Sequence, residues 1–365
     1  MPYFANSVPV TLLTGFLGSG KTTLLSTLLK SPELSRTAVI INEFGEVGLD
    51  HSLMEHSDDK IVELQSGCIC CTIQNDLRKT LKNLIRRRYR GGGLERVVIE
   101  TTGLADPVPI IHTLMTAPDL VAAYQLETVI TLVDAVNGSS TLDLHTEAVK
   151  QAAMAEKLVI SKTDLMDGEA VGELVRRLQA LNPAASIFCG QPTETGAPSF
   201  LTGGGYDPFN RSEDARNWLQ AELYTANEYA HHHDHNLNRH GDNIHAFALT
   251  HDQPIRRFAF EMFLDMLTMS LGPKLLRTKG IVNVLGEDSP AVIHGVQQIF
   301  HPVRWLDRWP DSDHRTRIVF ITVGTPKEEV EHFFRILIDA AERVLGEMKD
   351  EPKRRRGFRR KSVTA

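Results

Sequence analysis

The sequence lacks the features that mark secreted, membrane-spanning and nucleic-acid-binding proteins. It has no apolar stretch near the roughly 20 residues that cross a bilayer, and no apolar signal region precedes the first expected strand at Val8. With four cysteines and no sign of an oxidising compartment, disulfides are not expected. A net charge of −6 argues against bulk nucleic-acid binding. We therefore expect a cytoplasmic protein with no membrane or nucleic-acid partner.

The chain is long enough for more than one core. It has 365 residues, of which 42% are hydrophobic. Strand patterns at 8–13, 37–41, 96–99, 128–133 and 157–160 alternate with helical patterns, which predicts an α/β fold with a mainly parallel sheet and helices on both faces. From residue 244 onward, strands and two long helical segments are mixed. This change predicts a smaller C-terminal α+β domain.

A phosphate-binding loop is predicted between the first strand and the first helix. The segment from Gly15 to Thr22 has the spacing G-x-x-x-x-G-K-T, in which glycines let backbone N–H groups converge on phosphate oxygens. The following helix directs its N-terminus at the same anion, Lys21 adds a full charge, and the Thr22 hydroxyl is placed to bind Mg²⁺. The expected nucleotide-binding residues in this segment are Gly15, Gly18, Ser19, Gly20, Lys21, Thr22 and Thr23.

Two later segments identify the nucleotide. The strand at 96–99 ends in Glu100, an acid that can hold the water shell of Mg²⁺, and Gly103 lies three residues on, where its N–H can sense a γ-phosphate. Alone, this spacing also fits an ordinary turn. In Ser161-Lys162-Thr163-Asp164 the carboxylate can accept two hydrogen bonds from guanine, although Asp164 as a helix N-cap is an equal alternative. Together with the phosphate loop, these motifs favour GTP, with Lys21, Thr22, Glu100 and Gly103 in catalytic roles.

Three of the four cysteines lie within four positions, at Cys68, Cys70 and Cys71. An amphipathic helix is expected to follow them, with Thr72 as its N-cap, and a helix N-terminus favours the thiolate that binds Zn²⁺ or Co²⁺. Three sulfurs do not complete a tetrahedral site. Glu43, Glu46, a histidine, water or a partner protein can supply the fourth ligand, and an incomplete site suits a carrier.

A histidine-rich segment is the other candidate metal site. Residues 231–251 hold seven of the fifteen histidines, a density at which imidazoles form weak, exchangeable metal sites. A solvated polar linker is the alternative interpretation. The candidate auxiliary ligands are His231, His232, His233, His235 and His240, whereas His245 and His251 are expected in the first strand and turn of the second domain.

In this order, G-F-L-G-S-G-K-T-T-L-L, I-N-E-F-G-E-V-G-L-D, G-C-I-C-C, E-T-T-G-L-A-D-P and S-K-T-D resemble the CobW family of P-loop GTPases. Segments 275–280, 294–297 and 317–321 resemble its C-terminal domain. The resemblance implies a GTPase that binds a transition metal through the three cysteines and hands it to a client metalloprotein under nucleotide control. It also implies that Lys162 and Asp164 contact guanine. Ser161 departs from the family, which commonly has Asn there.

These motifs give a domain plan and a ranking of functions. The expected parts are a P-loop GTPase domain over 1–228, a histidine-rich linker over 229–243, a C-terminal CobW-like domain over 244–350 and a disordered basic tail over 351–365. Zinc is the preferred metal, because thiolate and imidazole both suit it, and cobalt for cobalamin synthesis or a nitrile hydratase is the alternative. Two other functions stay open: a metal buffer or sensor with incidental GTPase activity, and a small-molecule kinase with structural cysteines.

Overall fold

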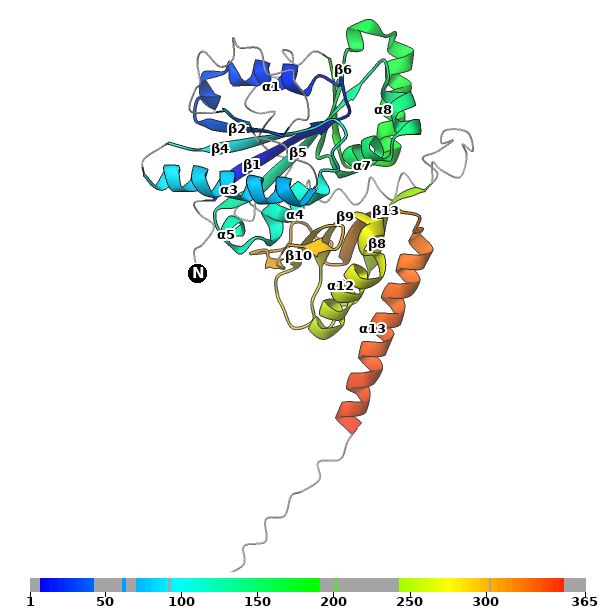
Figure 1. Cartoon of the computed structure of the whole chain (residues 1–365). Coiled ribbons are helices and arrows are strands. Elements are labelled where there is room, and N and C mark those ends of the chain that lie inside the picture. Colours follow the sequence, from blue (N-terminus) through cyan, green and yellow to red (C-terminus); the bar gives the residue numbers. More distant parts are fainter. Residues whose placement is uncertain are drawn as a thin grey trace, which may run out of the picture.

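The computed structural model describes residues 7–42, 61–63, 70–90, 93–190, 201, 243–301 and 303–350. They form two sheets, one of seven strands near the N-terminus and one of six strands near the C-terminus (Figure 1). No helix in this described part is long and apolar enough to cross a membrane. The predicted boundary near 228, the linker over 229–243 and the basic tail lie outside the described residues, apart from position 243.

The first sheet is entirely parallel, as the strand pattern predicts. Its order is β3-β2-β4-β1-β5-β6-β7, so the phosphate-loop strand β1 lies in the centre. The five predicted strands are present, and the two short edge strands β3 and β7 were not expected. The strands are β1 (Val8–Gly15), β2 (Thr37–Asn42), β3 (Ile61–Glu63), β4 (Arg96–Thr101), β5 (Tyr124–Asp134), β6 (Lys157–Ser161) and β7 (Ser186–Cys189).

Helices cover both faces of this sheet, which confirms the predicted fold class (Figure 1). Successive side chains of a strand point to opposite faces, so Leu12 joins the core that includes α3 and α4, whereas Leu13 joins the core that includes α1. The helices are α1 (Lys21–Leu29), α3 (Cys70–Tyr89), α4 (Val108–Thr116), α5 (Pro118–Val121), α6 (Gly138–Leu144), α7 (Thr146–Met154) and α8 (Gly168–Leu181).

Helix α3 begins three residues earlier than predicted, at Cys70 and not at Ile73. The expected N-cap, Thr72, lies inside the helix, and Cys70 and Cys71 form its first two positions. The prediction of Thr72 as the N-cap is therefore wrong. A threonine is a favoured N-cap only where the preceding residues leave helical geometry, and the backbone here is already helical at Cys70. The predicted apolar face is confirmed, because Leu77, Leu81 and Leu84 are buried.

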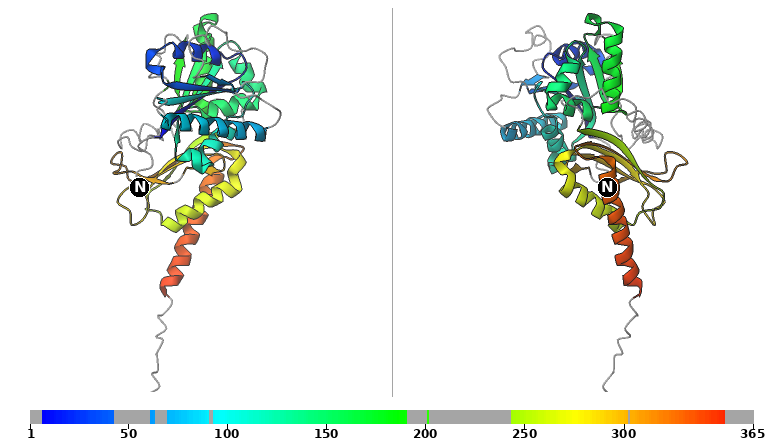
Figure 2. Two further views of the ribbon diagram at one scale, coloured as in Figure 1. Left: turned by 60° about the vertical axis from the view of Figure 1, so that its left-hand side comes forward. Right: turned by 90° about the vertical axis from the view of Figure 1, so that its right-hand side faces the viewer.

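The second sheet is antiparallel and packs between two layers. Helices α12 and α13 share a core with one of its faces, whereas Leu276 and Val319 on the other face pack with Ala153 of α7 (Figure 2). Strand β9 is paired with β10 and β13. The elements are β8 (Ile244–His251), β9 (Leu275–Val282), β10 (Ala291–Val296), β11 (Ile299–Phe300), β12 (Arg304–Trp305), β13 (Thr316–Val323), α12 (Arg257–Leu271) and α13 (Lys327–Asp350).

A buried ionic cluster joins the two sheets. Arg277 of β9 donates from Nη1 to the Ala155 carbonyl at 2.8 Å and pairs through Nη2 with Glu156 Oε1. The second oxygen of Glu156 accepts from the Val129 N–H at 2.7 Å, and Lys279 Nζ lies 3.9 Å from Oε1. Arg277, Lys279 and Glu156 are 3%, 4% and 8% exposed. Solvent therefore screens these charges little, and the end of α7 is fixed to the C-terminal sheet.

His294 of β10 and His301, the residue after β11, predict a loss of stability in acid. The rings of His294 and His301 lie 5.0 Å apart, and burial, together with Arg304, lowers the pKa of His301 to about 4. In the unfolded chain its pKa is about 6.5, so between these values the unfolded state binds the proton and the folded state does not. We expect the free energy of unfolding to fall by up to about 3 kcal/mol from this group as pH drops from 6.5 to 4.

Urea unfolding of the wild type and of His301→Gln at several pH values measures this effect. The variant should lose less stability than the wild type over the same pH interval. His332→Gln, on the exposed side of α13, is the control and should follow the wild type. Parallel pH profiles for the wild type and His301→Gln would contradict the assignment.

Candidate functional site

The loop between β1 and α1 has the backbone that its glycines predict. Gly15, Gly18 and Gly20 have φ values of 139°, 71° and 93°, all in the region that favours glycine. A Cβ on Gly15 would lie 2.4 Å from the Leu132 carbonyl oxygen, whereas one on Gly18 would meet nothing within 4 Å. The loop is therefore held against β5 on one side and open on the other. This open, left-handed turn before a helix N-terminus fits a chain of phosphate groups.

Lys21 is held inside this loop. Its side chain is 6% exposed, and Nζ donates to the carbonyls of Gly15 at 3.0 Å and Phe16 at 3.2 Å. The loop thus curls around the ammonium group and places a positive charge beside the N-terminus of α1. Thr23, the last residue of the predicted set, lies exposed in the first turn of α1.

Thr22 and Glu100 meet, although they are 78 positions apart in the sequence. The Thr22 hydroxyl donates to Glu100 Oε1 at 2.8 Å, and Glu100 is 1% exposed at the end of β4. Parallel strands end at one edge of a sheet, so the end of β4 lies beside the end of β1. A hydroxyl and a carboxylate are the oxygen ligands that Mg²⁺ prefers. These two residues therefore fit the magnesium of a bound nucleotide.

Gly103 lies directly against the phosphate loop. A Cβ on Gly103 would lie 2.5 Å from the backbone nitrogen of Leu17, so only glycine fits this approach. The loop is tied to α7 because Gln151 Nε2 donates to the carbonyls of Gly103 at 3.2 Å and Ala105 at 3.0 Å. Asp106 accepts from the Val108 N–H at 2.9 Å and pairs with Lys150 at 3.0 Å. Through these contacts, Asp106 connects the N-terminus of α4 with helix α7.

The predicted guanine-recognition segment joins the same edge of the sheet. Ser161 Oγ donates to the Ser19 carbonyl at 2.7 Å, which ties this segment to the phosphate loop. Lys162 has a φ of 57° and its Nζ lies 2.7 Å from Asp134 Oδ2. Burial opposes the charge of Asp134 most strongly, but hydrogen bonds from Lys162, the Val136 N–H and Asn137 outweigh it and lower its pKa. Lys162 is thus oriented by a carboxylate that stays ionised.

Asp164 is exposed in a short 3₁₀ turn over Thr163–Leu165, and it is not the N-cap of the following helix. That cap is Asp167, whose side chain accepts from the Ala170 N–H at 2.8 Å. The alternative interpretation of Asp164 as an N-cap is therefore wrong.

Two residues near this edge, Asp134 and Gln151, are not part of the predicted site. Asp134 ends strand β5, and an acid directly after a buried apolar strand was a signal that could have found it. Gln151 gave no such signal, because it lies within a helix and its contacts with Gly103 and Ala105 span more than 40 positions.

The predicted metal ligands lie outside the residues whose side chains are described. This applies to Glu43, Glu46, Cys68 and the five candidate histidines, and only the backbone of Cys70 and Cys71 is described. Among the side chains that are described, no three of the types His, Cys, Asp and Glu form a metal-binding cluster. Both cysteines lie in the first turn of α3, where backbone N–H groups favour thiolate.

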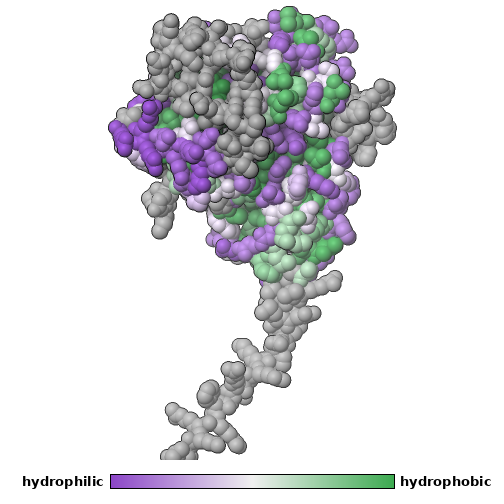
Figure 3. Space-filling model, in the orientation of Figure 1, coloured by the Kyte–Doolittle hydropathy of each residue, from purple (hydrophilic) through white to green (hydrophobic). Residues whose placement is uncertain are grey.

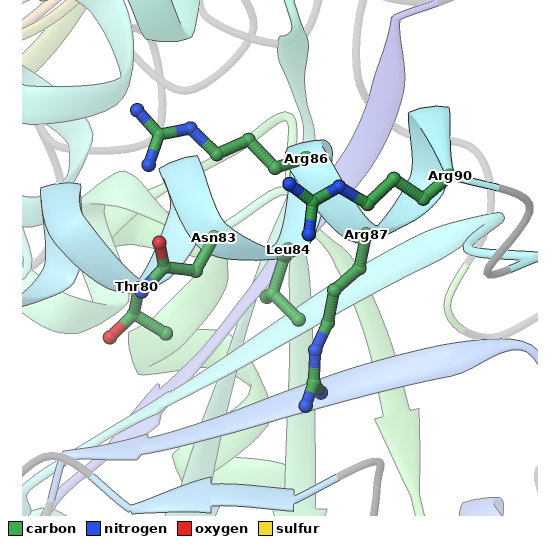
Figure 4. Close-up of a pocket in the computed structure, with 6 residues that line it drawn as sticks. All are labelled: Thr80, Asn83, Leu84, Arg86, Arg87 and Arg90. Carbon is green, nitrogen blue, oxygen red and sulfur yellow. The ribbon is translucent and has the colours of Figure 1, made fainter.

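The arginines Arg86, Arg87 and Arg90 at the other end of α3 are exposed to solvent. Arg86, Arg87 and Arg90 extend from its last turns and line a depression of about 440 Å³ (Figure 4). Figure 3 shows hydrophilic residues gathered over this end of α3. Cations at a helix C-terminus are stabilised by the helix dipole, which accounts for their position.

Comparisons with known proteins agree with this arrangement. Residues 9–189 match the CobW/HypB/UreG nucleotide-binding domain, and residues 244–337 match the C-terminal domain of the cobalamin synthesis protein CobW. The zinc chaperone YjiA of Escherichia coli is 33% identical over 331 residues, covering 90% of this chain and 98% of its own. The zinc chaperone CobW of Pseudomonas aeruginosa is 30% identical over 353 residues, covering 86% and 87%.

A solved structure agrees with both domains. The crystal structure of Zn(II)-bound YjiA GTPase from E. coli aligns with a TM-score of 0.63 and 27% identity, over 91% of this chain and 99% of that one. The match spans the nucleotide site and the C-terminal sheet together. The chain belongs to the CobW family of P-loop GTPases.

Proposed function

We propose that this GTPase is a metallochaperone that binds zinc at Cys68, Cys70 and Cys71 and transfers it to a client protein under the control of its nucleotide. The observation that carries the proposal is the position of the cysteines. Two of them are the first two residues of α3, in a chain of a GTPase family in which Thr22 and Glu100 lie together beside the phosphate loop. Relatives named zinc chaperones, one of them with a Zn(II)-bound structure, support zinc as the cargo.

In the proposed mechanism, the phosphate loop and Lys21 bind the phosphates, and Asp164 reads the guanine edge. Thr22 and Glu100 would hold Mg²⁺, which neutralises phosphate charge. The N–H of Gly103 responds to the γ-phosphate. Because α3 shares a core with α4, which follows the Gly103 loop, movement of that loop can reach the first turn of α3. Glu43 or Glu46 would complete the metal site, and the histidine-rich segment would capture metal before transfer.

Zinc affinity in three nucleotide states tests this proposal. We expect a chelator-competition titration to give at least about tenfold tighter binding with a non-hydrolysable GTP analogue than with GDP or no nucleotide, because ligand orientation changes metal affinity by such factors. Equal affinity in the three states would remove the nucleotide switch. Repeating the titration with Co²⁺ distinguishes a cobalt chaperone from a zinc chaperone.

Matched cysteine variants test the ligand assignment. Cys70→Ser should lose most of the tight zinc binding while GTP affinity is unchanged. Cys189→Ser removes an exposed thiol at the end of β7, far from the cluster in sequence, and should bind zinc like the wild type. If Cys70→Ser also binds zinc like the wild type, the three-cysteine site is wrong. Transfer of zinc to an apo-metalloprotein, measured with and without GTP, then separates a chaperone from a buffer.

A further inference from the structure

Gln151 has a buried side chain and is not among the predicted catalytic residues. It is 0% exposed on α7, and its amide nitrogen donates both hydrogens, to Gly103 O at 3.2 Å and Ala105 O at 3.0 Å. An amide nitrogen has two N–H donors, so both donors of Gln151 bind carbonyls of the same loop. That loop connects the end of β4 with α4 and contains the proposed γ-phosphate sensor.

The oxygen of the same amide is buried at a cost in folding free energy. Gln151 Oε1 has no hydrogen-bond partner among the described residues, and neither does Ser19 Oγ of the phosphate loop. Both residues line one small cavity behind the phosphate loop, together with Asp134. An unsatisfied buried acceptor costs folding free energy, and an apolar residue of similar shape would avoid this cost. The amide is therefore better explained by what it holds than by a contribution to stability.

The loop that Gln151 contacts, which contains Gly103 and Ala105, lies between the phosphate loop and helix α7. On one side, Gly103 approaches the backbone of Leu17 so closely that a Cβ would lie 2.5 Å from its nitrogen. On the other side, α7 contacts the loop twice, through Gln151 and through the ion pair of Lys150 with Asp106 at 3.0 Å. A shift of α7 would thus move the Gly103 N–H relative to the phosphate loop.

Helix α7 is itself fixed at its C-terminal end by the C-terminal sheet. The Ala155 carbonyl, just past the helix, accepts from Arg277 at 2.8 Å and from Asn182 Nδ2 at 2.8 Å. Nearer the middle, Thr131 Oγ1 donates to the Gln151 carbonyl at 2.8 Å and fixes α7 to β5. The position of Gln151 is thus determined by the sheet beneath it and by the second domain.

We propose that Gln151 is a positioning residue for GTP hydrolysis, which holds the Gly103–Ala105 backbone in register with the phosphate loop through its two amide hydrogen bonds. It touches neither nucleotide nor metal in this role. The inference rests on the proposed function of Gly103 as the γ-phosphate sensor. It does not depend on which metal is carried.

Gln151→Met tests the inference, because methionine keeps the length of the side chain and removes both donors. We expect kcat for GTP to fall at least about tenfold, since small misplacements of a reacting group have effects of this size or larger. KM for GTP and affinity for GDP should stay within about twofold, because the base and phosphate contacts are intact.

Thr322→Val is the matched control. Thr322 of β13 is also 0% exposed, and its hydroxyl donates to the Thr325 carbonyl at 2.5 Å, a contact made within the C-terminal domain. Only Gln151→Met should lower kcat. A kcat within about twofold of wild type for Gln151→Met, or an equal loss for Thr322→Val, would overturn the proposal.

Two further variants keep the test decisive. If Gln151→Met does not fold, Lys150→Gln removes the second, partly exposed link between α7 and the loop; a lowered kcat at unchanged KM supports the proposal and an unchanged kcat overturns it. Gly103→Ala separates this inference from the proposed function. If Gly103→Ala hydrolyses GTP normally, the sensor role of Gly103 fails. If it loses hydrolysis while Gln151→Met does not, only the role of Gln151 fails.

Discussion

Replacing Lys21 with methionine is expected to lower the affinity for GTP by about 10- to 100-fold, because a charge-assisted hydrogen bond contributes about 1.5–3 kcal/mol and each 1.4 kcal/mol is tenfold. Lys21 is 6% exposed, and its Nζ donates to the carbonyls of Gly15 and Phe16 inside the loop. This geometry places the positive charge of Lys21 where the phosphates of a nucleotide would bind. Methionine keeps the packing of the stem and removes only the ammonium group, so the loop loses its cation without a cavity.

Fluorescence titration with a labelled GTP measures this loss, and a phosphate-release assay should show hydrolysis falling with it. Lys30→Met is the matched control. Lys30 is exposed at the end of the same helix, so its variant removes an equal charge from the chain without changing the loop. GTP affinity within about threefold of wild type for Lys21→Met would show that the loop does not bind the triphosphate in the proposed way.

The nucleotide edge was predictable because its signals are local. Eight consecutive residues, Gly15 to Thr22, fix the turn and its helix, since the positive φ values require glycine at set positions. Glu100 and Ser161 each lie in the last two residues of a strand that is apolar and therefore recognisable. Parallel strands bring such ends to one edge whatever the length of the connections, so the meeting of Thr22 with Glu100 followed from the fold class.

Other features were not predictable, because their causes lie far away in the sequence. The predicted start of α3 was three residues too late, since local capping preferences are weak and tertiary packing decides where a helix begins. Gln151 bonds a loop 48 positions before it, and Arg277 meets Glu156 across 121 positions. Contacts between residues so far apart in the sequence leave no periodic pattern in it. The ion pairs that join the two sheets could therefore be found only in the structure.

The second large effect concerns the buried ion pairs that Glu156 makes with the C-terminal sheet. Glu156→Gln is expected to lower the free energy of unfolding by about 3–5 kcal/mol, because removing one partner of a buried ion pair leaves uncompensated charge. Glu156 is 8% exposed, and both Arg277 and Lys279 face its carboxylate. Burial and the neighbouring Arg277 already hold the pKa of Lys279 well below its usual value, with Glu156 opposing this. Losing that carboxylate increases repulsion among the remaining charges.

Thermal and urea unfolding measure the loss, and Glu261→Gln is the control. Glu261 pairs with Arg257 on the exposed side of α12, where both side chains are more than half exposed, so its loss should cost at most about 0.5 kcal/mol. A loss below about 1 kcal/mol for Glu156→Gln would show that the cluster does not hold the sheets together. If α7 transmits the state of the second domain, Glu156→Gln should also lower kcat for GTP at temperatures where the variant is fully folded. A stability loss with unchanged kcat would instead confine the cluster to a structural role, because the end of α7 would then move without disturbing Gln151.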